Sequence, residues 1–209
     1  GVRFDEKDIS KLNRISSLEY VLPWMSKTVT ISGGGNSELS DYLASTENLF
    51  DGLKLEAEYG ELFTKADVSK RAKVVVLGPE IAKKLFGSPA NAFGKTIKIE
   101  KQNFKVIGVS KAKGGGGFGG PSFDSYLYIP YKTAFVFDPD KKFAALVAKV
   151  KDGQNTSAAK LAMEEELLRR YNEDDFSVIE QTELLSAITS IFSVINLVLV
   201  AIAAISLLV

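Results

Sequence analysis

The sequence lacks cysteine and histidine altogether, and its 26 basic and 26 acidic side chains leave no net charge. Without cysteine there is no disulfide framework, no thiol catalysis and no thiolate zinc site. Without histidine, the commonest general base and metal ligand is missing. A balanced charge argues against a nucleic-acid binder and against a polybasic membrane-surface protein. These absences leave few routes to catalysis.

A signal peptide is also missing, because the chain starts with the polar and charged segment GVRFDEKD. What the sequence does contain is a run without any charge from Leu184 to Val209. A hydrocarbon core about 30 Å thick needs about 20 apolar residues in a helix, so this run predicts a membrane-spanning helix, and we interpret Val209 as the edge of a domain cut. The alternative is a buried core helix. If the preceding domain lies across the membrane, we expect another spanning helix upstream of Gly1.

In the N-terminal block, helix-capping residues and alternating apolar residues predict the secondary structure. Asp5 can cap a short helix in which Ile9, Leu12 and Ile15 recur about once per turn. The segment KTVTIS alternates like a half-buried strand and ends at Gly33. The expected elements are therefore a helix after Asp5, a strand over Leu18–Leu22 closed by Pro23, a strand over KTVTIS, and a helix over Ser37–Ala44.

The middle third has clearer signals. GPEIAKKLFG predicts a compact helix, with Pro79 at its first position, Glu80 in its first turn and Gly87 as a left-handed stop. TIKIE and FKVIGV flank three polar residues and predict a β-hairpin. Further strands are expected over Lys73–Leu77 and Tyr126–Ile129.

The third block begins near Phe143 with the strand pattern FAALVAKV. Thr156 or Ser157 can cap a helix that runs to Tyr171, and FSVIE then predicts another strand. The fold class is therefore α+β, with two lobes and a final helix. We expect residues 1–52 and 142–183 to form one porter-like βαβ lobe, residues 53–141 an inserted strand-rich lobe, and residues 184–209 a truncated transmembrane helix.

The sequence contains only weak matches to motifs for catalysis or for binding phosphate or metal ions. PANAFGKT resembles a phosphate-binding loop, but Pro89 stands where its first glycine should be, and a strand pattern follows where a helix is required. Glu164, Glu165 and Glu166 point around a predicted helix and are most simply a solvated face. A carboxylate-only calcium site or hydrolase stays open. We assign no catalytic, cofactor or metal residue and expect no enzyme.

The glycine-rich segment GGGGFGG, residues 114–120, is the one candidate contact site. Its residues Gly114, Gly117, Phe118 and Gly120 are predicted to touch a partner, with Phe118 as the anchor. Ordering such glycines costs about 1 kcal/mol or more per residue, which a partner would have to offset. A plain spacer between two strands is the alternative.

Five separated pieces, in order, resemble the periplasmic core domain of MacB-type ABC transporter permeases, which belong with the FtsX-like permeases. They are YGELFTKAD, with Glu61 in place of the usual arginine; the strand and helix VVVLGPEIAKKLFG; GKTIKIEKQNFKVIGV; SYLYIPYKTA; and AAISLLV. The likeness covers most of the chain from about Tyr59 onward. The first fifty residues match only in pattern.

The resemblance implies a two-lobed extracytoplasmic domain, residues 1–183, on a cytoplasmic-membrane permease. It implies as partners the membrane, an ATP-binding domain or subunit, a second copy in a homodimer and an adaptor protein, with no nucleic acid. The implied function is to couple ATP hydrolysis to export or to an envelope partner. The alternative is a non-transporting interaction module that regulates a cell-wall hydrolase.

Overall fold

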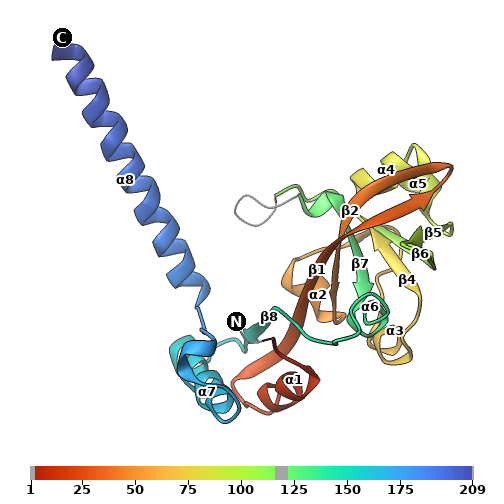
Figure 1. The fold of residues 1–209 in the computed structure, drawn as a ribbon, viewed down its shortest axis with the longest axis horizontal. Helices are drawn as coiled ribbons and strands as arrows, with labels where there is room; N and C mark the ends of the chain where they lie inside the picture. Colours follow the sequence, from red (N-terminus) through yellow and green to blue (C-terminus); the bar gives the residue numbers. More distant parts are fainter. Residues whose placement is uncertain (1–2, 116–121, 209) are drawn as a thin grey trace. The chain divides into compact units, whose positions relative to one another are not determined.

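The computed structural model describes residues 3–115 and 122–208, and the chain divides into two compact units. These are Val2–Lys149 and Val150–Val209 (Figure 1). Helices and strands alternate in the first unit and helices alone make up most of the second, so the predicted α+β class is confirmed.

The first unit contains short helices and a set of strands that carry most of the core. Its helices are α1 (Glu6–Leu12), α2 (Asn48–Gly52), α3 (Lys65–Lys70), α4 (Pro79–Phe86), α5 (Pro89–Ala92), the 3-10 turn η1 (Phe123–Ser125) and α6 (Tyr131–Ala134). Its strands are β1 (Leu18–Gly33), β2 (Asn36–Ser45), β3 (Ala57–Gly60), β4 (Val74–Leu77), β5 (Thr96–Ile99), β6 (Gln102–Ser110), β7 (Tyr126–Pro130) and β8 (Ala145–Val150).

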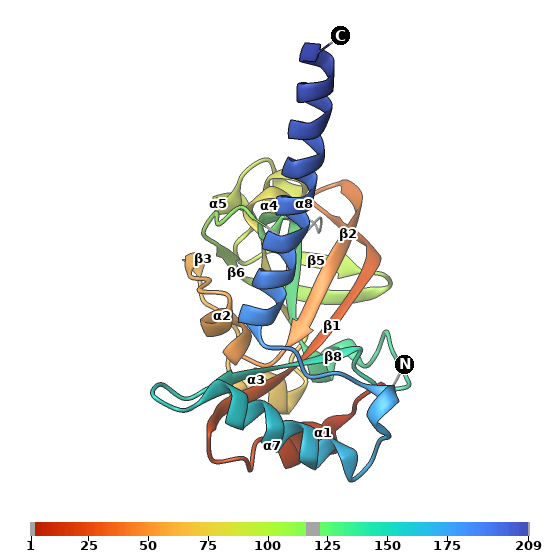
Figure 2. The ribbon, with the colours of Figure 1, turned by 90° about the vertical axis from the view of Figure 1, so that its left-hand side faces the viewer.

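Six of these strands pair into a closed ring. The order is β1–β2–β7–β4–β6–β5 and back to β1, with parallel pairs β2–β7 and β4–β6 and antiparallel pairs elsewhere. Figure 2 shows β1, β2 and β5 side by side. β3 adds to β6 and β8 to β1 outside the ring. Each ring strand therefore has a neighbour on both sides, which removes the free edges that an open sheet presents.

Alternation along the ring strands separates a core from an outer face. On β5, Ile97 and Ile99 are buried while Thr96 and Lys98 are exposed. Ile97 lies opposite Phe104 of β6, and Phe104 stacks on Phe137 with ring centroids 5.9 Å apart. Burial of apolar side chains such as these is the main favourable term in the stability of the core.

The helix predicted over Ser37–Ala44 is wrong, because these residues form β2. Gly34 and Gly35 have φ of 59° and 86°, as a tight two-residue hairpin turn requires, and they fold β2 back on β1. The four-residue spacing of Leu39 and Leu43 has no helical meaning: Leu39 is 72% exposed and Leu43 is fully buried.

Two other strand predictions are corrected. Pro23 does not close a strand, since β1 continues through it to Gly33. The paired register of β1 with β2 begins only at Met25, and the Pro23 carbonyl accepts a 2.6 Å hydrogen bond from the Ser45 hydroxyl. The missing N–H of proline is therefore not needed in that ladder. FSVIE is not a strand in the structure; no ladder partner pairs with it among the described residues.

The capped helices are confirmed. Asp5 accepts from the Lys7 N–H at 2.9 Å and begins α1, and α4 runs from Pro79 to the left-handed Gly87. The strands predicted over residues 73–77, 96–110 and 126–129 are confirmed as β4, β5, β6 and β7.

The second unit consists of α7 (Thr156–Leu168), the 3-10 turn η2 (Glu173–Asp175) and α8 (Gln181–Leu208). The N-cap of α7 is Asn155, whose side chain accepts from the Ala158 N–H at 2.9 Å, in place of the predicted Thr156 or Ser157. Within α8, Gln181–Val200 is long and apolar enough to cross a membrane, with mean hydropathy 2.0 and none of it buried. This exposure disagrees with the alternative of a buried core helix.

The division into a lobe of residues 1–52 and 142–183 and a lobe of residues 53–141 stays a prediction. The sheet does not stop at the proposed boundary: β2, from the first segment, pairs along Asp41–Ser45 with β7 of the middle third. Parallel pairing between segments some 85 residues apart has no local signal in the sequence.

Candidate functional site

The glycine-rich contact site falls partly outside the described residues. Gly117, Phe118 and Gly120 lie there, so their predicted partner contact stays a prediction. Gly114 and Gly115 are described, with φ of 62° and 65°, a conformation that glycine adopts without strain. The structure therefore defines the two stems from which this segment leaves the ring, residues 113–115 and 122–124.

The stems are joined by a buried carboxylate that the sequence analysis missed. Asp124 is 8% exposed and accepts the Lys113 N–H at 2.7 Å and the Gly114 N–H at 2.9 Å. The Phe123 N–H donates to the Gly115 carbonyl at 2.9 Å. Hydrogen bonds to a charged acceptor are stronger than neutral ones, so these contacts fix the separation of the stems. The pattern SFDS after a glycine run, typical of a side-chain-capped turn, is the signal that could have found Asp124.

The stem residues are also held from the ring side. The Tyr128 hydroxyl donates to the Phe123 carbonyl at 2.7 Å, and the Gly78 N–H donates to Tyr126 O at 2.8 Å. A Cβ at Gly78 would collide with the carbonyl oxygen of Asp124, so the start of α4 touches this segment through bare backbone. Burial, with the charge of Asp124 as a smaller cause, raises the pKa of Tyr128 far above its usual value, which keeps the phenol protonated as a donor.

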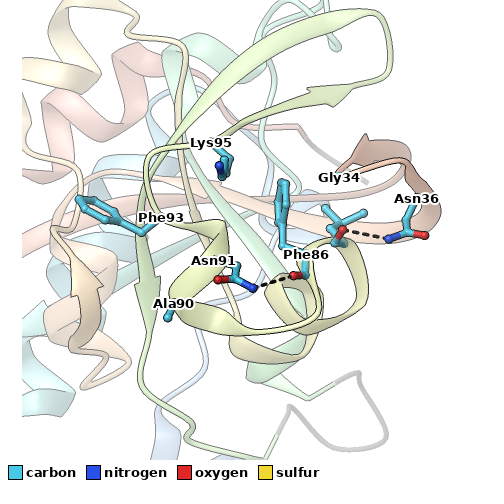
Figure 3. Close-up of a pocket in the computed structure, with 8 residues that line it drawn as sticks. Gly34, Asn36, Phe86, Ala90, Asn91, Phe93 and Lys95 are labelled. Carbon is cyan, nitrogen blue, oxygen red and sulfur yellow. Dashed lines mark hydrogen bonds between the residues drawn. The ribbon is translucent and has the colours of Figure 1, made fainter.

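An open pocket of about 700 Å³ lies between the β1–β2 turn and the end of α4 (Figure 3). The Asn36 amide donates to the Leu85 carbonyl at 3.0 Å, and the Asn91 amide donates to the Phe86 carbonyl at 3.3 Å. These two amides satisfy the last carbonyls of α4. The other lining residues are Gly34, Ala90, Phe93 and Lys95.

This pocket offers binding groups and no catalytic pair. Lys95 is its one charged side chain, and no acid or second base lies in its lining. In the described ranges, no group of three or more acidic side chains is arranged to hold a metal ion. The lining can therefore contact a ligand or partner through Phe93, which is 50% exposed, but it contains no nucleophile with an adjacent base.

In the second unit, an ion pair joins α7 to the first turn of α8. The Lys160 ammonium contacts both carboxylate oxygens of Glu183, at 2.8 and 2.9 Å. The Glu180 N–H donates to the same carboxylate at 3.0 Å. Hydrogen bonding to Glu183 raises the pKa of Lys160. The contact links α7 directly to the first turn of the apolar helix.

Comparison with known proteins gives a consistent result. The model of the family "MacB-like periplasmic core domain" matches residues 2–166. The macrolide export ATP-binding/permease protein MacB of Chlorobaculum tepidum is 32% identical over 211 residues, covering 91% of this chain and 30% of that protein. The pyoverdine export ATP-binding/permease protein PvdT of Pseudomonas aeruginosa is 31% identical, covering 90% of this chain and 29% of its own.

Solved structures agree with the sequence matches. The periplasmic region of MacB from Actinobacillus actinomycetemcomitans superposes with a TM-score of 0.78 at 25% identity, covering 90% of this chain and 84% of that one. The extracellular domain of the transporter YknZ from Gram-positive bacteria shares the fold, with a TM-score of 0.71 at 19% identity. The chain spans about 30% of the length of the curated relatives it matches.

Proposed function

The chain belongs to the family of MacB-like periplasmic core domains, the periplasmic part of MacB-like ABC transporter permeases, and we propose that it transmits motion driven by ATP hydrolysis to a partner outside the cytoplasmic membrane. The ATP-hydrolysing domain is a separate domain or subunit, and this chain catalyses nothing itself. Residues 1–183 lie on the extracytoplasmic side, and the helix from residue 184 enters the membrane. Two copies work as a homodimer, with an adaptor protein as a further partner.

The observation that carries this proposal is the Lys160–Glu183 ion pair at the start of α8. A rotation or shift of an apolar helix reaches a folded domain only if the junction resists bending. Here the junction is held by a two-oxygen contact from α7 in addition to the backbone. Relatives at similar identity are named for macrolide export and for pyoverdine export, so the proposal concerns coupling and leaves the cargo unassigned.

The test uses the full-length permease in proteoliposomes, with a spin label at Ser157, an exposed position of α7, in each protomer. Pulsed electron paramagnetic resonance measures the distance between the two spin labels with and without ATP. The wild type is expected to change its distance on ATP addition. Lys160→Glu is expected to keep basal ATPase activity and lose most of that change, and the swapped pair Lys160→Glu/Glu183→Lys to regain it.

Arg169→Glu is the matched control, because Arg169 is the exposed cation at the C-cap of α7 and pairs locally with Glu166 at 3.4 Å. It should leave the ATP-dependent distance change intact. If Lys160→Glu responds to ATP like the wild type, the ion pair is no transmission joint. If the wild type shows no ATP-dependent change at all, the coupling proposal itself fails.

A further inference from the structure

The zero net charge of the chain conceals a strongly uneven distribution. Residues 65–113 contain twelve Lys or Arg and three Asp or Glu, a net charge of +9. Residues 150–209 contain four basic and nine acidic residues, a net charge of −5. All twelve basic residues of the first segment are exposed. A segment of 49 residues with this charge creates a strong local positive potential even though the whole chain is neutral.

Five of these lysines gather on the β5–β6 hairpin and the residue that leads into β4. We name them the lysine face: Lys73, Lys95, Lys98, Lys101 and Lys105. The strand pairing places Lys98 and Lys105 side by side on the outer face. Lys101 lies in the hairpin turn, Lys73 precedes β4, and Lys95 lines the pocket beside α4. Lys98 lies opposite Asn103, so that Lys105 is its diagonal neighbour, about 7–8 Å away by strand geometry. Lys105 also donates its N–H to the Lys73 carbonyl at 2.9 Å.

The lysine face is not neutralised by the protein itself. None of its five ammonium groups forms an ion pair with a residue in the ranges 3–115 and 122–208. The one carboxylate on this hairpin, Glu100, accepts the Thr30 N–H of β1 at 3.0 Å. Lys73 donates to the neutral Gln102 at 2.7 Å. Like charges at this spacing repel, and an opposite charge from outside would relieve the repulsion.

Short polar side chains accompany Lys98 and Lys105 on the outer face of the hairpin. Thr96 lies opposite Lys105, Ser32 lies opposite Lys98, and Ile97 and Phe104 point inward. The ring holds these side chains at fixed strand spacing, so the face offers directional hydrogen bonds together with positive charge. The outer positions of the hairpin, Thr96, Lys98, Asn103 and Lys105, are all polar, and the exposed ring of Phe93 lies in the pocket beside Lys95 instead.

We propose that the lysine face is the docking surface for a protein partner that presents a carboxylate-rich segment. Charge complementarity gives specificity and a fast encounter, and the neighbouring hydroxyl and amide groups would fix the register of the bound segment. This surface is distinct from the Lys160–Glu183 joint and does not depend on ATP coupling. The family implies that a partner exists, and the lysine face adds that this partner is acidic at its contact site.

The experiment uses the full chain in uncharged maltoside micelles and a fluorescein-labelled decaglutamate peptide, with binding followed by anisotropy. In 50 mM salt the wild type is expected to bind the peptide, and 300 mM salt to weaken binding severalfold, because exposed charges are screened within about 10 Å at 0.1 M salt. Lys98→Gln/Lys105→Gln is expected to weaken binding about tenfold. Lys83→Gln/Lys84→Gln is the matched control, since it removes two exposed charges of the same segment from α4 instead of the strand face.

The control is expected to change binding less than threefold, and both variants to keep the wild-type melting temperature. The proposal is overturned if the wild type does not bind the peptide, or if both variants weaken binding equally, which would mean attraction by net charge alone. It is also overturned if monomeric dihexanoyl phosphatidylglycerol or a ten-nucleotide oligothymidine binds more tightly than the peptide and depends on the same two lysines. Those outcomes would identify a lipid headgroup or a nucleic acid as the natural ligand.

Discussion

The strand ring and helix α8 are both rich in apolar side chains, but the ring buries them and α8 exposes them. On β5 the apolar residues alternate with polar ones, and Ile97 and Ile99 are at most 1% exposed. On α8 the apolar residues continue around the whole helix, and Leu197 and Val200 are more than 60% exposed. The spacing of the apolar residues matters more than their number. Alternating apolar residues pack into a core that is surrounded by water, whereas a continuous apolar run gives a helix surface that suits lipid.

The largest expected effect comes from removing the apolar part of helix α8. Deleting residues 184–209 should move the protein from the membrane fraction to a soluble, monomeric species, because the exposed apolar area leaves with the helix. Sedimentation in detergent-free buffer measures this. Aggregation or unfolding of the shortened chain would mean that α8 belongs to the soluble core.

The next largest effect is expected in the buried core of the strand ring. Phe104→Ala removes a fully buried ring that stacks on Phe137 and should lower the free energy of unfolding by about 3–5 kcal/mol. Leu39→Ala, at a position 72% exposed, is the control and should change it by less than about 0.5 kcal/mol. Urea unfolding followed by circular dichroism gives both values. Equal losses would show that Leu39 is covered in solution.

A pH experiment sharpens the comparison at one buried group. Burial, followed by the charge of Asp138, raises the pKa of Tyr42 to about 12. Since the folded pKa exceeds the unfolded value of about 10, the contribution of Tyr42 to stability should be intact below pH 10 and fall by roughly 2 kcal/mol between pH 10 and 12. Tyr20 and Tyr128, whose pKa values are also raised by burial, add to the total fall. Urea unfolding across this pH range measures the fall, and Tyr42→Phe should make it shallower. An unchanged slope in the variant would assign the fall to other groups.

The smallest effect is expected at the stems of the glycine-rich segment. Asp124→Asn keeps the shape of the side chain but loses its charge and one of the two acceptor oxygens that hold Lys113 and Gly114. We expect a loss of about 1–2 kcal/mol in the free energy of unfolding, with the ring intact. Hydrogen exchange at those two N–H groups should speed up more than exchange in β5. Equal acceleration in both places would contradict a local role.

What the sequence predicts well here is local. Pro79 and Gly87 delimit α4 through backbone preferences that need no tertiary partner, and the β5–β6 hairpin follows from alternation around a short polar turn. Gly34 and Gly35 demand a hairpin as strongly, but the spacing of Leu39 and Leu43 led to a helix prediction. At the candidate site, the glycines are visible in the sequence, and SFDS indicates a capped turn, but the hydrogen bonds of Asp124 to Lys113 and Gly114 are not visible there. Asp124 is identified by its burial and its two backbone donors, which depend on contacts made after folding.

The hydrogen bonds between residues 113–115 and 122–124 hold the two stems together independently of what connects them. Because Asp124 and Tyr128 hold the stems from the ring side, flexible residues added between the stems should cost little, about 0.6 kcal/mol for each doubling of a flexible loop. An epitope or a fluorescent reporter inserted between the stems is therefore expected to leave the core folded.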